Sequence, residues 1–285
     1  MKSDKCGKVI LVVVEDLTRR AMEETETPNM DVLIKAGALG FARQPVASSS
    51  KSFPLCGILT SREPACVLDS NERDSLMGAA DSIVDMAHGK GRSTAGYFYR
   101  SRFHNLFHLY GPFDYPALPT SEHARGNNQA RIGTAAMAAK EIVSLRPDFC
   151  LIYIASQENV GGRPAVGCPL NLKHVRMSDA SLGVLLGSLS LFGLFGEYHI
   201  LLTGEMGGRY KDYEERSPAE FDVPWLAFGP RIARGMTIGG PVSLADTAPT
   251  MAELMDLPSM PSWQGKPLHE AILGPECNHC ERSVA

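Results

Sequence analysis

The stretch VILVVV, Val9–Val14, predicts a β-strand, and it ends abruptly in the acidic pair Glu15 and Asp16. An apolar run rich in β-branched residues, with no polar alternation, is typical of a strand buried on both faces in a parallel sheet. Two later runs have the same character, Phe149–Ala155 (FCLIYIA) and Tyr198–Thr203 (YHILLT). We therefore expect these three segments to be adjoining central parallel strands of one sheet.

Helical patterns alternate with these strands along the chain. A helix is expected to begin at Pro28, with apolar positions that run on to Leu39. Further helices are expected at 53–60, 70–88, 128–145, 170–191 and 243–257, and further strands at 94–99 and 223–228. This alternation predicts an α/β fold, a doubly wound, mostly parallel sheet with helices on both faces.

The 285 residues contain no internal repeat, low-complexity segment or linker, so we expect a single domain over residues 1–285. Residues at about 101–127 are rich in aromatic residues, proline and glycine, and are expected to form a small irregular insertion.

Composition and charge exclude several classes of protein. Apolar residues make up 44% and charged residues 21% of the chain, and a net charge of −4 argues against nucleic acid as a partner. The apolar stretches are interrupted before the roughly 20 residues that a membrane span requires. The start, MKSDKCGK, lacks the features of a signal peptide. We therefore expect no membrane partner and a cytoplasmic location.

The cysteine content favours reduced thiols, because there are seven cysteines and the chain shows no signal peptide. Cys277 and Cys280 form a CxxC with an internal histidine, the spacing of half a zinc site. No second pair at matching spacing accompanies them, which favours a solvated tail over a metal site. The sequence does not settle their role.

Four blocks of sequence follow the first strand in a specific order. They are TPNMDVLIKAGALGF at 27–41, SSSKSFPLCGILTSREP at 48–64, VPWLAFGPRIARG at 223–235 and PVSLADTAPTMAELMDLP at 241–258. Together with the strand, they resemble the alkaline phosphatase superfamily, in particular its nucleotide pyrophosphatase/phosphodiesterase branch. The resemblance implies an alkaline phosphatase-like fold and a hydrolase that uses two divalent metal ions.

The resemblance also assigns candidate site residues in the first half of the chain. The branch opens with a strand that ends in an aspartate ligand, and Glu15 stands in that place, with Asp16 at the usual glycine position. The branch places a threonine or serine nucleophile before an LTG-R-P turn, and Ser52, before Phe-Pro, is the candidate here. Its spacing is one residue short, so Lys51 is the alternative occupant of that position.

The histidine ligands of the superfamily have no counterparts in the second half of the chain. Glu158 replaces the aspartate of D-x-x-G-H, whose histidine is absent, and Gly204-Glu205 stands where Asp-His is usual. The last histidine would precede the Val-Pro strand, but residues 210–222 contain none. Because lost ligands lower metal affinity steeply, we do not expect a dinuclear zinc site.

The replacements nevertheless place carboxylates at the ends of three strands, namely Glu15, Glu158 and Glu205. Ligands of parallel sheets bind at the carboxyl ends of the strands, so we expect these glutamates and Ser52 to share one small-molecule pocket. Carboxylates suit one hard cation, Mg²⁺, Mn²⁺ or Ca²⁺, bound by these glutamates and Asp16. Alternatively, one carboxylate is a general acid or base with a raised pKa.

Three functions are compatible with these patterns. The favoured one is a diverged hydrolase or group transferase for a phosphate, phosphonate or sulfate ester or a related anionic small molecule, with Ser52, Glu158 and Glu205 as catalytic residues. The alternatives are a catalytically inactive binding or scaffold protein and an enzyme with a metal-independent reaction. The sequence indicates neither the substrate nor the oligomeric state. Asp246, in SLADTAPT, is interpreted as a structural residue that caps a helix start.

Overall fold

The structure, a computed structural model, describes residues 7–43, 53–62, 82–98, 112–117, 128–154, 167–205 and 222–273. The strands are β1 (Lys8–Glu15), β2 (Ala38–Arg43), β3 (Thr94–Phe98), β4 (Tyr115–Ala117), β5 (Phe149–Ile154), β6 (Tyr198–Glu205), β7 (Asp222–Phe228) and β8 (Met236–Thr237). The helices are α1 (Arg19–Glu23), α2 (Pro28–Ala36), α3 (Phe53–Thr60), α5 (Ile83–Gly89), α7 (Asn128–Leu145), α8 (Pro169–Leu191), the 3₁₀ turn η6 (Leu244–Asp246) and α9 (Thr247–Leu254).

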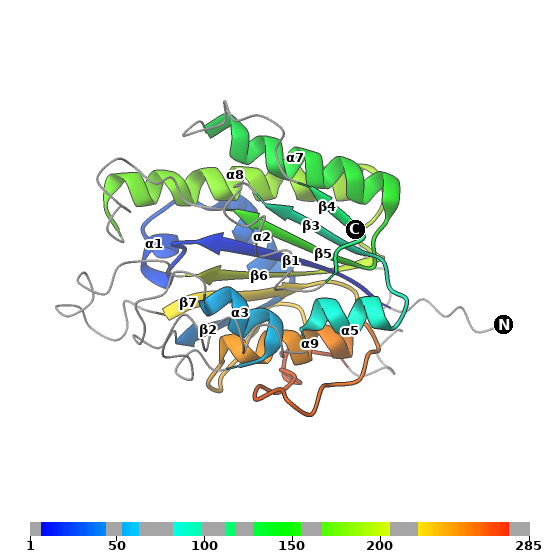
Figure 1. Ribbon diagram of the computed structural model, residues 1–285. Helices are drawn as coiled ribbons and strands as arrows, with labels where there is room; N and C mark the ends of the chain where they lie inside the picture. Colours follow the sequence, from blue (N-terminus) through cyan, green and yellow to red (C-terminus); the bar gives the residue numbers. More distant parts are fainter. Residues whose placement is uncertain are drawn as a thin grey trace, which may run out of the picture.

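The eight strands of the sheet lie in the order β4-β3-β5-β1-β6-β7-β2-β8. β1 pairs in parallel with β5 on one side and β6 on the other, as the three apolar runs predicted. Among these strands, only β7 runs antiparallel to its neighbours, β6 and β2. The expectation of a mostly parallel α/β sheet is therefore confirmed (Figure 1).

Helices cover both faces of the sheet (Figure 1). On one face, Ile10, Val12 and Val14 of β1 pack in a core that includes residues of α1, α2, α7 and α8. The alternate residues Val9, Leu11 and Val13 pack on the other face with residues of α3, α5 and α9. All six side chains are at most 1% exposed, which explains why this strand has no polar alternation.

The structure differs from the sequence-based expectation in two edge regions. Helix α2 ends at Ala36, and Leu39 lies in strand β2, because Gly37 ends the helix where the backbone approaches β7. A Cβ on Gly37 would lie 2.1 Å from the Ala227 carbonyl oxygen, so only glycine fits there. The expected irregular insertion contains a regular strand, β4, which pairs in parallel with β3.

Side chains cap the starts of α1, α5 and η6, whereas α2 and α8 have no side-chain cap hydrogen bond. Ser82 and Asp85 form a capping box at the start of α5, so this helix begins at Ile83 and not at residue 70, where the sequence pattern predicted its start. None of the helices in the ranges given above is long and apolar enough to cross a membrane.

Candidate active site at the carboxyl ends of β1 and β6

Glu15 and Glu205 lie side by side at the carboxyl ends of the two central strands. They are register partners in the β1–β6 ladder, and their side chains are 1% and 2% exposed. Side chains alternate between faces along a strand, so both glutamates share the α3 face with Val13 and Leu201. The structure thus brings together two of the three glutamates that were predicted from the strand ends.

Asp16 follows in a left-handed backbone conformation, with φ 60° and 4% exposure. Its N–H donates to the Glu205 carbonyl oxygen at 2.6 Å, which continues the β1–β6 ladder past the strand end. Aspartate tolerates this conformation better than most residues, at a cost of about 1 kcal/mol relative to glycine. Glycine, the residue usual here in the superfamily that the chain resembles, would adopt this conformation without strain.

The turn after β1 packs closely on β6. A Cβ on Gly204 would lie 2.0 Å from the Leu17 carbonyl oxygen, so a glycine must precede Glu205. Thr18 then caps helix α1 through a hydrogen bond from the Ala21 N–H to its hydroxyl. The backbone after β1 is therefore fixed by its close packing on Gly204 of β6 and by the Thr18 cap of α1.

Helix α8 contributes two buried polar side chains that the sequence analysis did not single out. The Asn171 Nδ2 donates to the Asp16 carbonyl oxygen at 3.0 Å, and the His174 Nε2 lies 2.6 Å from the Glu15 carbonyl oxygen. A carbonyl oxygen only accepts, so Nε2 of His174 carries a proton. The available signal was a row of polar residues on the buried side of this helix, which continues with Ser178 and Asp179.

The other predicted site residues, Ser52 and Glu158, lie outside the described residues, as does Lys51. Helix α3 begins at Phe53, directly after Ser52, and packs on the face that Glu15 and Glu205 share. Within this helix, burial raises the pKa of the Cys56 thiol above its usual range, although a hydrogen bond with Thr60 opposes the shift. The Cys56 side chain therefore belongs to the core and is poorly suited to act as a thiolate nucleophile.

Asp246 has a structural role, as predicted, but at a different place from the expected one. Its carboxylate accepts hydrogen bonds from the Ser243 N–H and the Lys266 N–H, both at 2.8 Å. The first bond completes a capping box at η6, whereas the side chain makes no capping bond to α9. The residue therefore ties the 3₁₀ turn to the segment that follows α9.

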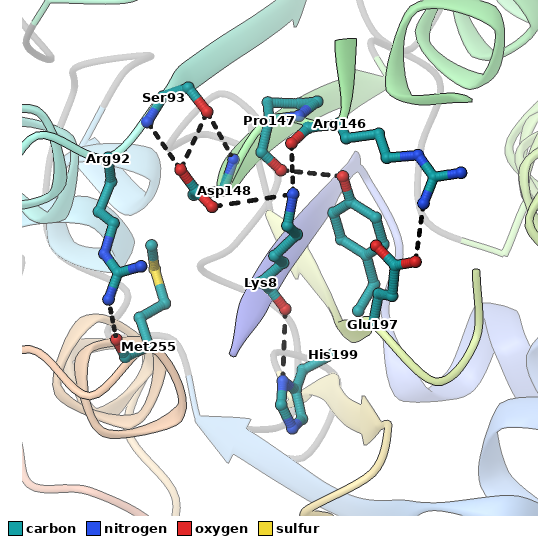
Figure 2. Close-up of polar contacts among 10 residues, drawn as sticks. Lys8, Arg92, Ser93, Arg146, Pro147, Asp148, Glu197, His199 and Met255 are labelled. Carbon is teal, nitrogen blue, oxygen red and sulfur yellow. Dashed lines mark hydrogen bonds and ion pairs between the residues drawn. The ribbon is translucent and has the colours of Figure 1, made fainter. Parts of the chain in front are cut away.

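The opposite end of the strands is closed by a polar network (Figure 2). Lys8 pairs with Asp148 at 3.8 Å and donates to the Arg146 carbonyl oxygen. Asp148 accepts from both the N–H and the hydroxyl of Ser93 at 3.0 Å. His199 is buried in the same region, and burial, with a smaller effect of the Arg231 charge, lowers its pKa from 6.5 to about 4. These contacts hold the strand beginnings together.

The donor atoms at the carboxyl ends decide which metal site the chain fits. The described donors there are the carboxylates of Glu15, Asp16 and Glu205, while the Nε2 of His174 is engaged by a carbonyl. Within the described ranges, no group of three or more histidine, cysteine, aspartate and glutamate side chains is arranged to hold a metal ion. The described residues by themselves therefore do not complete a metal site.

Comparison with known proteins supports the fold. No protein-family model matches the chain. Among curated proteins, arylsulfatase K from Xenopus laevis is 34% identical over 82 residues, 27% of this chain and 15% of that protein. The chain thus matches only a small part of that relative.

The solved structures align over most of the chain. The lipoteichoic acid synthase LtaP from Listeria monocytogenes has a TM-score of 0.73 and 15% identity, covering 93% of this chain and 76% of that one. An alkaline phosphatase superfamily protein from Vibrio parahaemolyticus has a TM-score of 0.66 and 15% identity, with 92% and 69% covered. For the phosphonate monoester hydrolase from Silicibacter pomeroyi, the values are 0.63 and 11%, with 95% and 78% covered.

These likenesses identify the architecture as that of the alkaline phosphatase superfamily. The resemblance inferred from the sequence blocks is confirmed at the level of the fold, and the identities of 11–15% show no more than the fold.

Proposed function

We propose that the chain is a hydrolase or group transferase for an anionic ester of the phosphate, phosphonate or sulfate class. The observation that carries the proposal is the pair Glu15 and Glu205, two buried carboxylates on neighbouring strands at the edge where parallel sheets bind ligands. Buried acidic pairs are costly to a fold, which favours a functional reason for their presence.

In the proposed reaction, the Ser52 hydroxyl attacks the phosphorus or sulfur of the ester. The bond from Ser52 Oγ to that atom forms as the bond to the leaving oxygen breaks, and the Ser52 proton passes to a carboxylate, Glu158 or Glu205, before it reaches the leaving alcohol. Water then attacks the phosphorus or sulfur bound to Ser52, the bond to Ser52 Oγ breaks, and the proton of the water passes through the carboxylate back to Ser52. A second alcohol in place of water completes a transfer. In the alternative arrangement, Glu15, Glu158 and Glu205, with Asp16 as a further ligand, would hold a single Mg²⁺, Mn²⁺ or Ca²⁺ that offsets the charge of the ester oxygens.

The comparisons support this substrate class. The matched relatives include an arylsulfatase and a phosphonate monoester hydrolase, both named for anionic esters. The position of α3 supports the role of Ser52, because that helix begins at the next residue and packs on the face of Glu15 and Glu205. We also propose a reducing, cytoplasmic location, which the free thiols of Cys56, Cys150 and Cys168 favour.

A non-catalytic binding protein is the second candidate. One observation favours it: the described carboxylates do not by themselves form a group that could hold a metal ion. In that case Glu15 and Glu205 serve only the local structure, and removing their charge changes stability without changing any turnover.

The test is a screen of the purified chain against phosphate monoesters and diesters, phosphonate monoesters and sulfate esters, each with added Mg²⁺, Mn²⁺ or Ca²⁺. We expect turnover of at least one class, and a loss of about 10²-fold or more in kcat for Glu205→Gln and Ser52→Ala. Glu26→Gln, at an exposed position of the same sign, is the matched control and keeps full activity. No turnover of any class rejects the proposal in favour of the binding protein. Equal turnover in all variants means that Ser52 and Glu205 do not carry the activity, and it rejects the proposed reaction.

A further inference from the structure

Two side chains of α8 hold the backbone on which the candidate site is built. Asn171 donates to the carbonyl oxygen of Asp16, and His174 donates to the carbonyl oxygen of Glu15. The two residues are three positions apart, so they project from the same side of the helix. Together they bind both carbonyl groups of the acidic junction, and we refer to them as the α8 pair.

The α8 pair is buried, and further hydrogen bonds reach the side chain of Asn171 and the backbone of His174. The Asn171 Oδ1 accepts from the Gly167 N–H at 2.9 Å, so both ends of its side-chain amide are used. His174 lies one turn before Ser178, whose hydroxyl donates to the His174 carbonyl oxygen at 3.0 Å. The exposed fractions are 0% for Asn171 and 3% for His174, so water does not compete for these bonds.

The junction needs such support because Asp16 has a left-handed φ of 60°. The third bond, from the Asp16 N–H to the Glu205 carbonyl oxygen at 2.6 Å, ties the same peptide to β6. The peptide between Glu15 and Asp16 therefore has its oxygen bound by α8 and its nitrogen bound by β6. Rotation of this peptide would move the Glu15 side chain relative to Glu205.

We propose that Asn171 and His174 are positioning residues that fix the Glu15 carboxylate against the Glu205 carboxylate. The inference rests on the proposed function, in which these carboxylates act together. In this inference, side chains of α8, on the other face of the sheet, hold the candidate site in place. Both side chains act as hydrogen-bond donors, and each donor can be removed without changing the carboxylates.

The experiment compares two variants that lose a hydrogen-bond donor with one variant that keeps it. Asn171→Asp keeps the shape and the acceptor for Gly167 but cannot donate to Asp16, and His174→Met removes the donor at similar volume. His174→Gln keeps an N–H donor at the end of a flexible side chain. Ser188→Ala is the matched control, because it removes a hydrogen bond to the Val184 carbonyl on the same helix, away from the junction.

The first readout is hydrogen exchange of the Asp16 amide in the full chain, measured under conditions in which every variant is folded. We expect exchange to be at least tenfold faster in Asn171→Asp and His174→Met, and close to wild type in His174→Gln and Ser188→Ala. Unchanged exchange in both donor-loss variants overturns the positioning role. Equal acceleration in His174→Gln and His174→Met also overturns it, because packing and not the donor would then be responsible.

The second readout is Mn²⁺ binding by calorimetry, which separates this inference from the proposed function. We expect the Kd for Mn²⁺ to rise about tenfold in both donor-loss variants and to rise further in Glu205→Gln. If wild type fails to bind Mn²⁺, or if Glu205→Gln binds it normally, the proposed cation site is wrong while the exchange result still decides the positioning role. If Glu205→Gln weakens binding and the donor-loss variants do not, the positioning role is wrong and the site stands.

Discussion

Asn29 and Asp179, 150 positions apart in sequence, are joined by hydrogen bonds from both the backbone and the side chain of Asn29. The Asp179 carboxylate also accepts from the Met30 N–H at 2.8 Å, so it binds two N–H groups in the first turn of α2. A carboxylate in this place satisfies donors that a helix start leaves unpaired, and it complements the helix dipole. The contact fixes α2, and with it the TPN block, against α8.

Replacement of Asp179 by alanine is expected to destabilise the fold by about 3 kcal/mol, because buried N–H groups at the start of α2 lose a charged acceptor. The measurement is the free energy of unfolding in urea. Lys35→Ala, at an exposed position of α2, is expected to change the free energy of unfolding by no more than about 0.5 kcal/mol. A similar small effect in both variants would show that water replaces Asp179 without cost.

Gly183→Ala should destabilise the fold although alanine favours helices. A Cβ at Gly183 would lie 2.7 Å from the Asn29 Oδ1, so it displaces the amide that binds Asp179. Gly187 is the matched control, because it lies four residues further along α8 and a Cβ there meets nothing within 4 Å. We expect Gly187→Ala to raise the melting temperature, with a gain of about 0.5–1 kcal/mol, and Gly183→Ala to lower it. A rise in both would contradict the close contact.

Asp16→Gly separates the backbone role of this residue from its charge. Glycine adopts a φ of 60° without strain, so this variant is expected to be as stable as wild type or more stable by about 1 kcal/mol. Asp16→Val is expected to destabilise by about 2 kcal/mol or more, because a β-branched residue is strained at positive φ. Thermal denaturation of both variants provides the measurement. If valine is tolerated as well as glycine, the left-handed conformation is not required.

The stability of the fold is expected to fall with pH because of His199. Its Nδ1 lies 3.3 Å from the Lys8 carbonyl oxygen, and its Nε2 accepts from the Arg231 N–H at 3.3 Å, so the neutral ring is the bound form (Figure 2 shows the Lys8 contact). Burial lowers its pKa from 6.5 to about 4, so below pH 6.5 the unfolded chain takes up a proton that the folded chain refuses. The contribution of the neutral His199 ring to the free energy of unfolding is fully present above pH 6.5. It is lost as the pH falls towards 4, by about 3 kcal/mol in total.

The measurement is the free energy of unfolding between pH 7.5 and pH 4, for wild type and for His199→Gln. In this pH window, the free energy of unfolding of the variant is expected to depend less steeply on pH, by the contribution of about one proton. His269→Gln is the control, since that side chain is 73% exposed, and it should keep the wild-type slope. An unchanged slope in His199→Gln would mean that the ring titrates alike in the folded and unfolded chain, which contradicts the lowered pKa.

The centre of the fold could be predicted from sequence because its strands are buried on both faces. The runs at β1, β5 and β6 show no alternation of apolar and polar residues, although His199 lies near the start of β6, and this pattern is typical of central parallel strands. The edge could not be predicted in the same way. β4 has three residues, with Tyr115 exposed, and β2 follows a helix after the single residue Gly37, so neither gives a periodic signal of its own.

The candidate site was predictable in part, for a related reason. The ends of adjacent parallel strands meet at one edge, and this rule placed Glu15 beside Glu205. The roles of Ser52 and Glu158 stay predictions. The rule did not predict Asn171 and His174, because these residues contact the end of β1 from helix α8. The position of a polar residue in a helical pattern does not indicate which strand its side chain will contact.

The central position of β1 has a consequence for the order in which the chain is made. β1 precedes the other strands of this sheet in the chain, yet Val9 pairs with Phe149 and with His199, so the two neighbours of β1 emerge from the ribosome much later. Until then, a six-residue uncharged run of high β-propensity has both edges open to other chains. Pairings over such distances also form slowly. A nascent chain that stalls before residue 198 exposes this segment, so aggregation during synthesis is the main hazard that this topology creates.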